Sequence, residues 1–185
     1  MRRAIKLTEA SSPCVLWIDE LEKAFAGVGS GGSEVTTRLF GSFLTWMQEK
    51  DSLAFVVATA NKIDALPPEL LRKGRFDETF FVNLPNKNER RKILEIHIGK
   101  RRKDDLTHID LDKLVGKTDG YCGADLEGIV REGIESAFVN KEETLNTNHI
   151  LTAIESTHSL SEVMKDSIGI MIETYKKLKL KSASK

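Results

Sequence analysis

These 185 residues contain few cysteines and histidines and have no excess of charge of either sign. The two cysteines, Cys14 and Cys122, lie far apart and show no C-x-x-C spacing, which excludes a disulfide framework and favours reduced thiols. The four histidines are scattered without ligand spacing, so a histidine metal site is not expected. Lys+Arg and Asp+Glu balance at 28 each, which removes any overall attraction to nucleic acid or to an anionic membrane.

Long apolar runs are also missing. The longest, residues 53–60, is far too short to cross a bilayer, and no apolar signal core follows Arg2 and Arg3. We therefore expect a cytoplasmic protein with no membrane partner. Lysines gather only at the end of the chain, where we interpret residues 181–185 as a disordered basic tail and not as a nucleic-acid arm.

What the sequence does contain is the pattern of an α/β protein. Apolar runs typical of buried strands occupy residues 14–18, 53–58 and 79–82, and a helix beginning near Ser33 or Glu34 follows a Gly-rich loop over 27–33. Strands separated by helices favour a parallel sheet. After Pro85 only helical patterns follow, at residues 88–103, 111–115, 126–138, 147–155 and 160–178. We predict a partial parallel sheet over residues 1–85 and an all-helical domain over 86–180.

The most informative stretch runs from Cys14 to Glu20, an apolar strand that ends in Asp19 and Glu20. Open α/β sheets bind ligands at the carboxyl ends of their strands. A nucleotide hydrolase places one carboxylate near Mg²⁺ there and a second beside the attacking water. These two side chains are therefore the first candidates for a catalytic site.

The usual companion of such a strand, a phosphate loop of pattern G-x-x-x-x-G-K-[ST], does not occur in the 185 residues. Gly116-Lys117-Thr118 matches the last three positions of this pattern. However, the residue five positions before Gly116 is Leu111, and no strand precedes it. We assign this segment to a helical turn and not to a phosphate site.

Three further motifs follow in a fixed order. Asn61 leaves the second strand, Arg72 and Arg75 flank a glycine turn, and Gly123-Ala124 opens a helix. With Asp19-Glu20 before them, these motifs give a chain that resembles the AAA family of P-loop ATPases over about residues 1–160. The fold that this resemblance implies is a partial AAA+ ATPase core followed by a helical lid domain.

The resemblance also implies roles for single residues. Asp19 would lie beside Mg²⁺, usually through water, and Glu20 would activate the attacking water as general base. Asn61 is similar to the residue called sensor 1, which places that water. Arg72 and Arg75 resemble the arginine fingers that reach into the next subunit's ATP site. Gly123 and Ala124 match the lid turn near the adenine, and Cys122 stands where the family commonly has Ser, which predicts a weaker helix cap.

The family works as a ring, typically a homo-hexamer, that uses ATP and Mg²⁺ to remodel a protein substrate. In complete members the phosphate loop and the first pore loop precede the segment matched here. We therefore interpret the chain as the carboxyl-terminal part of such an ATPase, expected to bind ATP weakly or not at all alone and not to turn it over. Without the phosphate-loop strand, inner strands would also expose unpaired edges.

Simpler interpretations stand beside these. Asn61 can be a turn residue, Arg72 a surface arginine, and Gly123-Ala124 a close contact between helices. Trp17 and Trp46 are expected in the core, and Glu22 and Lys23 are expected to be solvated. At the level of function, the alternatives are a non-hydrolysing ring subunit that donates arginine fingers to a complete AAA partner, and a structural adaptor that binds protein through its helical domain.

Overall fold

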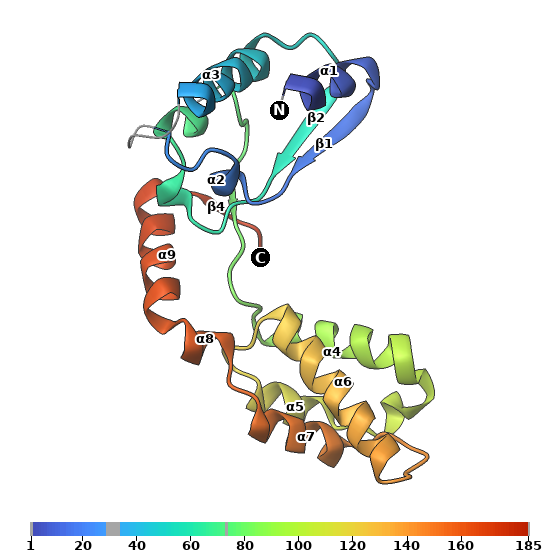
Figure 1. The fold of residues 1–185 in the computed structure, drawn as a ribbon. Coiled ribbons are helices and arrows are strands. Elements are labelled where there is room, and N and C mark those ends of the chain that lie inside the picture. The colour runs from blue at the N-terminus through green and yellow to red at the C-terminus, as the bar shows by residue number, and fades with distance from the viewer. Residues whose placement is uncertain (1, 29–33, 73, 185) are drawn as a thin grey trace. The chain divides into compact units, whose positions relative to one another are not determined.

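The structure, a computed structural model, describes residues 2–28, 34–72 and 74–184, which form two compact units (Figure 1). We call the part up to Thr79, together with Lys176–Leu178, the core unit, and the part from Phe80 to Tyr175, together with the residues from Lys179 onward, the lid unit. The sequence predicts a boundary after residue 85, whereas the contacts divide the chain between Thr79 and Phe80. None of the helices in the described ranges is both long and apolar enough to cross a membrane.

The core unit contains the predicted parallel strands. Strand β1 (Cys14–Ile18) pairs in parallel with β2 (Ala54–Ala58), with Cys14 opposite Ala54 and Ile18 opposite Ala58. The other elements are α1 (Arg2–Ala10), α2 (Leu21–Ala24), α3 (Glu34–Glu49) and the short 3₁₀ turns η1 (Ile63–Ala65) and η2 (Pro68–Leu71). Helix α3 provides the crossover that parallel strands require. Of the predicted glycine loop, residues 29–33 lie outside the described residues, and so does the candidate N-cap Ser33.

An aromatic cluster holds the core unit together. The ring centroid of Phe25 lies 5.0 Å from that of Phe40 and 5.4 Å from that of Phe43, and Trp46 packs beside them at 8% exposure. Trp46 is therefore in the core, as predicted. The prediction for Trp17 is wrong, because this side chain is 70% exposed. Successive strand side chains alternate between faces, and Trp17 shares the exposed face of the sheet with Val15, Phe55 and Val57.

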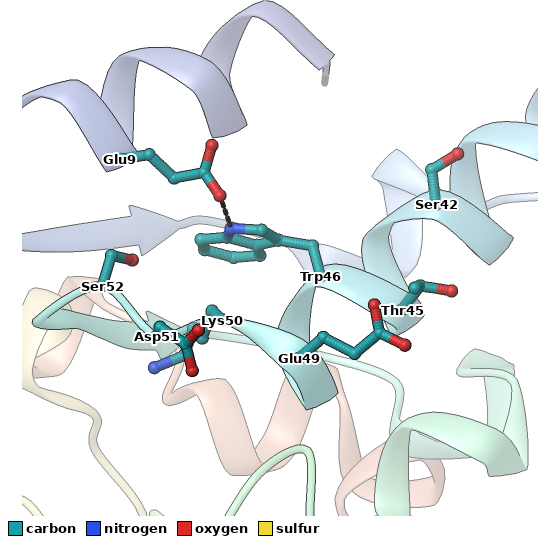
Figure 2. Close-up of a pocket in the computed structure, with 8 residues that line it drawn as sticks. All are labelled: Glu9, Ser42, Thr45, Trp46, Glu49, Lys50, Asp51 and Ser52. Carbon is teal, nitrogen blue, oxygen red and sulfur yellow. Dashed lines mark hydrogen bonds between the residues drawn. The ribbon is translucent and has the colours of Figure 1, made fainter.

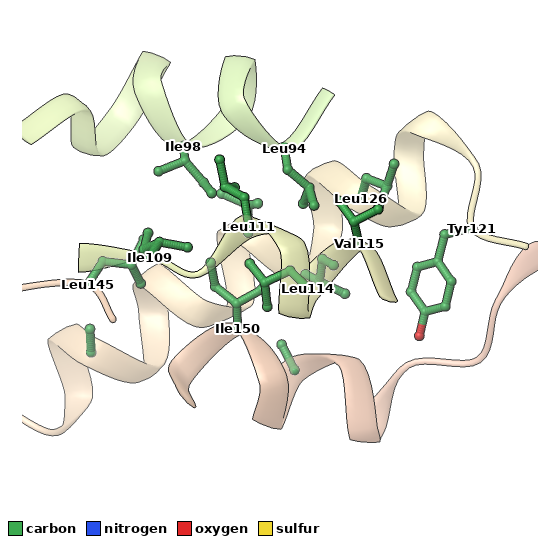
Figure 3. Close-up of a cluster of buried hydrophobic side chains, with 14 residues drawn as sticks. Leu94, Ile98, Ile109, Leu111, Leu114, Val115, Tyr121, Leu126, Leu145 and Ile150 are labelled. Atoms are coloured by element: carbon green, nitrogen blue, oxygen red, sulfur yellow. The ribbon is translucent and has the colours of Figure 1, made fainter. Parts of the chain in front are cut away.

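The lid unit is a helical bundle. The elements around its main core are α4 (Lys87–Arg102), the 3₁₀ segment η3 (Lys103–His108), α5 (Leu111–Lys117), α6 (Gly123–Val139) and α7 (Thr147–Ser156). Capping boxes at Asn86 and Asn146 satisfy the free N–H groups where α4 and α7 begin. The apolar faces of the helices meet in one core, in which Leu94, Leu126 and Ile150 are fully buried (Figure 3).

Two predicted segments differ in the structure. The expected helix over 160–178 forms as α8 (Leu160–Val163) and α9 (Lys165–Leu178), interrupted at Met164. The expected disordered tail contains β4 (Lys181–Ser182), which pairs in parallel with β3 (Phe80–Phe81) in the lid unit. Strand β3 thus pairs with the end of the chain and forms a second sheet. The physical reason is that an unpaired strand edge presents N–H and C=O groups that any neighbouring extended segment can satisfy.

Truncating the lid core should destabilise the protein strongly. We expect Leu126→Ala to lower the free energy of unfolding by about 2–5 kcal/mol, because it removes a fully buried side chain and leaves a cavity. Phe138→Ala, at a position of the same helix that is 83% exposed, should change it by less than about 0.5 kcal/mol. Chemical denaturation of both variants checks the contrast, and an equal effect of the two would contradict this assignment of the core.

A buried carboxylate should make the lid unit sensitive to acid. Asp105 Oδ2 accepts hydrogen bonds from the backbone N–H of Leu145 at 3.0 Å and from Arg102 Nε at 2.6 Å, and these contacts lower the pKa of Asp105. A pKa lowered by folding adds stability that is complete above the unfolded-state pKa of about 3.9 and is lost as the pH falls through the folded-state pKa. Asp105→Asn should therefore cost stability at pH 7, with a cost that shrinks below about pH 4. Thermal unfolding across this range checks it, and exposed Asp104→Asn is the control.

Candidate active site

The loops that follow β1 and β2 bring Asp19, Glu20 and Asn61 to one edge of the core unit. The strand pairing continues past both strand ends, since Thr59 N–H donates to the Ile18 carbonyl at 3.0 Å and Leu21 N–H donates to the Thr59 carbonyl at 2.8 Å. These bonds keep the two loops adjacent at the carboxyl end of the sheet, where ligands of α/β folds bind. We call Asp19, Glu20 and Asn61 the carboxylate–amide cluster.

Within this cluster, the predicted general base and the predicted sensor are in direct contact. Asn61 Nδ2 donates to Glu20 Oε1 at 3.2 Å. A carboxylate and an amide that share a hydrogen bond can also share a bound water, one accepting its proton and the other fixing its orientation. The interpretation of Asn61 as an isolated turn residue does not account for this contact.

Glu20 has a backbone conformation that is uncommon outside glycine. Its φ of 50° and ψ of 57° lie in the left-handed region, where a residue with a side chain costs of the order of 1–3 kcal/mol. This conformation lets α2 begin at Leu21, directly after the strand. Such strain is concentrated at functional sites, where the surrounding structure maintains it.

Lys23 is the second partner of Glu20. Its Nζ lies 2.7 Å from Glu20 Oε1 and 2.8 Å from Oε2, and this pairing raises the pKa of Lys23. The lysine is largely exposed, so the ion pair contributes little to stability. Because the Lys23 ammonium group lies beside the Glu20 carboxylate, a water that binds this carboxylate also lies close to the ammonium group.

Asp19 is suited to an indirect contact with a metal ion. It is exposed, and its Oδ1 accepts a hydrogen bond from Thr59 Oγ1 at 2.5 Å. Mg²⁺ keeps several waters and is typically held by one or two carboxylates together with substrate phosphates. In the described ranges no group of three His, Cys, Asp or Glu side chains could hold a metal ion alone. The residues present therefore fit a magnesium ion whose remaining ligands come from water and phosphate.

Sequence reasoning missed two residues here. Glu22, expected to be solvated, is only 8% exposed, and its Oε1 accepts the backbone N–H of Asn61 at 3.2 Å. That prediction is wrong, because the first two residues of α2, Leu21 and Glu22, are both buried. Thr59 is the second, because no motif singles it out. The signal that could have revealed it is the strand register, which places the first residue after β2 opposite Asp19.

Neither Arg72 nor Arg75 contacts the carboxylate–amide cluster. Arg72 follows η2, is exposed, and its guanidinium makes no polar contact with the described residues. Arg75 is half-buried and donates to the Glu69 carbonyl. An exposed guanidinium that has no polar partner among the described residues is compatible with action on another subunit.

Gly123 and Ala124 form the first turn of α6 in the lid unit. Apart from its chain neighbours and the backbone of its own helix, a methyl group added at Gly123 would meet no described atom within 4 Å, so packing against the other described segments does not require this glycine. Cys122 is the N-cap. Its Sγ accepts the Asp125 N–H at 3.4 Å, while Asp125 Oδ2 accepts the Cys122 N–H at 2.9 Å. The reciprocal bond completes the capping box that we expected Cys122 to weaken, and burial raises the pKa of the Cys122 thiol.

A hollow in the core unit lies away from the carboxylate–amide cluster (Figure 2). It is open, has a volume of about 680 Å³, and includes Trp46, whose indole N–H donates to Glu9 Oε1 at 3.0 Å. Its lining residues are Glu9, Ser42, Thr45, Trp46, Glu49, Lys50, Asp51 and Ser52. It shares no residue with the carboxylate–amide cluster, so it does not belong to the candidate site.

Comparison with known proteins gives two family matches along the chain. A family model described as "ATPase family associated with various cellular activities (AAA)" matches residues 1–84, and one described as "AAA+ lid domain" matches residues 108–152. Among curated relatives, an AAA domain-containing protein ycf46 of Pyropia yezoensis is 44% identical over 169 residues, which are 91% of this chain and 34% of the relative. The ycf46 protein of Guillardia theta is 43% identical, over 91% of this chain and 33% of its own length.

A more distant similarity is to the ATP-dependent zinc metalloprotease FtsH 2 of Sphaerobacter thermophilus. It is 32% identical over 162 residues, which are 85% of this chain and 24% of the relative. The chain thus spans about a third of the length of the ycf46 relatives and about a quarter of the FtsH relative.

Proposed function

Because the chain belongs to the AAA family of ATPases, we propose that its core unit carries the water-activating half of an ATP hydrolysis site. The observation that carries this proposal is the 3.2 Å contact between Asn61 Nδ2 and Glu20 Oε1 at the carboxyl end of two parallel strands. The left-handed backbone of Glu20 adds support, since strain of this kind is maintained where geometry matters.

In the proposed reaction, a water held between Glu20 and Asn61 attacks the γ-phosphorus of ATP. Glu20 accepts the proton of that water, and the bond from the γ-phosphorus to the bridging oxygen of ADP breaks. Asn61 keeps the water in line with that bond. When bound, Mg²⁺ neutralises charge on the phosphate oxygens, and Asp19 would hold it through water.

We extend the proposal to the assembly. Arg72 and Arg75 act on the ATP of a neighbouring copy, Gly123 and Ala124 in the lid unit contact the adenine, and the subunits form a homo-oligomeric ring. The ring is typically a hexamer in this family and acts in the cytoplasm on a protein substrate. The exposure of Arg72 supports its action on a neighbouring copy, and the open space at Gly123 supports a contact with the adenine.

Turnover should need a phosphate-binding loop, which the 185 residues do not contain. We expect no ATP hydrolysis by residues 1–185 alone, and Mg²⁺-dependent hydrolysis by the complete gene product that includes them and a phosphate loop. A coupled phosphate-release assay checks both. Turnover by residues 1–185 that Glu20→Gln abolishes would contradict the need for the loop.

The exposed Arg72 also favours a second candidate function, a non-hydrolysing subunit that lends its arginines to a complete AAA partner. In that case the chain should raise the ATPase rate of the partner, and Arg72→Ala should remove the gain. A gene product that binds ATP without hydrolysing it would favour this candidate over the first.

A further inference from the structure

We propose that Thr59 and Glu22 are positioning residues that set the relative placement of Glu20 and Asn61. This inference rests on the proposed function for its consequence and on the described contacts for its geometry. The two residues connect the segments that follow β1 and β2. Thr59, just after β2, binds Asp19 and Glu20 in the loop after β1, and Glu22, on α2, binds Asn61 in the loop after β2.

Thr59 provides the first link through one hydroxyl group. Its Oγ1 donates to Asp19 Oδ1 at 2.5 Å and accepts the backbone N–H of Glu20 at 3.0 Å. The hydroxyl therefore donates its single proton to Asp19 and uses one lone pair to accept the N–H of the next residue, Glu20. It holds the peptide at which the chain enters the left-handed conformation of Glu20, and so fixes the direction in which the Glu20 side chain leaves the backbone.

Glu22 provides the second link. Its Oε1 accepts the backbone N–H of Asn61 at 3.2 Å, and this bond fixes the residue whose side chain reaches Glu20. The other oxygen, Oε2, is buried and has no hydrogen-bond partner among the described residues. Burying a carboxylate with one oxygen unsatisfied costs free energy. Stability alone therefore does not explain a glutamate at this position, whereas holding Asn61 does.

The contact between Glu20 and Asn61 lies between these two links. Reaction rates depend steeply on such geometry, and a misplacement of 1 Å can cost about 100-fold. Neither Thr59 nor Glu22 needs to touch ATP to affect turnover. They act through the residues that they hold.

The first experiment needs no catalysis and uses residues 1–185. Exchange of the Glu20 backbone amide with water is followed by NMR in Thr59→Val, which keeps the shape of the side chain and removes the hydroxyl. We expect exchange to be about fivefold faster, as for loss of one hydrogen bond, and Thr59→Ser to restore most of the protection. Thr45→Val, at another exposed threonine, on α3, is the matched control. Because Thr59 is exposed, the variant should fold normally.

The second experiment measures ATP turnover by the complete gene product. We expect Thr59→Val to lower kcat by about 10- to 100-fold with little change in KM for ATP, and Thr59→Ser to recover most of it. Glu22→Met should act in the same way, while Glu22→Gln, which keeps an acceptor oxygen for the Asn61 N–H, should recover most of kcat.

The outcomes separate this inference from the proposed function. Unchanged Glu20 exchange in Thr59→Val would overturn the positioning role whether or not the protein hydrolyses ATP. Faster exchange without any ATPase activity in the complete gene product would leave the link intact and remove the proposed hydrolysis. Faster exchange with an unchanged kcat would overturn the catalytic consequence of the link.

Discussion

Glu20→Gln should reduce ATP turnover by the complete gene product about 10²–10⁴-fold, the usual contribution of a positioned general base. The substitution keeps the size of the side chain and an oxygen that can still accept the Asn61 hydrogen bond of 3.2 Å, but it removes the capacity to take a proton from water. ATP binding should persist, because the phosphate-binding groups are unaffected. Single-turnover kinetics and binding of a fluorescent ATP analogue separate the two effects.

The control for this prediction is Glu49→Gln, an exposed glutamate at the end of α3 that lies outside the carboxylate–amide cluster. It should leave turnover unchanged. Glu20→Gln also removes the charge pairing with Lys23, but an exposed ion pair contributes little to stability, so the melting temperature should change little. A large loss of stability together with the loss of turnover would assign Glu20 a structural role instead.

Arg72→Ala should have an effect of similar or greater size, about 10³–10⁵-fold in kcat, as found for arginine fingers in other nucleotide hydrolases. The guanidinium makes no polar contact with the described residues of its own chain, so its loss should not affect folding. Arg131→Ala, an exposed arginine on α6 in the lid unit, is the matched control and should retain full activity.

Mixing two inactive variants tests whether Arg72 acts on a neighbouring copy. When Glu20→Gln and Arg72→Ala subunits assemble together, some sites pair an intact Glu20 with an intact Arg72 from the next subunit. In a ring joined head to tail, random mixing of equal amounts should restore about a quarter of the sites. No recovery, in mixtures shown by mass spectrometry to contain both variants, would place the action of Arg72 within its own chain.

The parts of the fold that the sequence predicted are those with a strong local pattern. The apolar runs of β1 and β2 end in polar residues, and parallel pairing brings those ends together, so Asp19, Glu20 and Asn61 could be expected at one edge. The lid helices likewise follow from their apolar spacing and from caps such as Asn86 and Asn146.

The wrong or missing predictions concern residues whose surroundings depend on contacts with distant parts of the chain. Glu22 follows the two candidate site acids, Asp19 and Glu20, and looks solvated in the sequence, yet its side chain on α2 is buried. Trp17 is apolar, but strand alternation turns it to the exposed face. Pairing of Lys181–Ser182 with β3 joins distant segments of the chain, which no local pattern reveals. The role of Thr59 depends on the register between β1 and β2, and apolar spacing within a strand does not fix that register.

The exposure of Trp17 gives the protein a built-in optical probe. The chain has two tryptophans, and the other, Trp46, is buried beside Phe43. In a Trp46→Phe background, the emission wavelength of Trp17 would report directly on the solvent exposure of one sheet face. This face is formed by Val15, Trp17, Phe55 and Val57. Any polypeptide that covers this face in a longer protein or an assembly would shift the emission to the blue, without a label and without ATP.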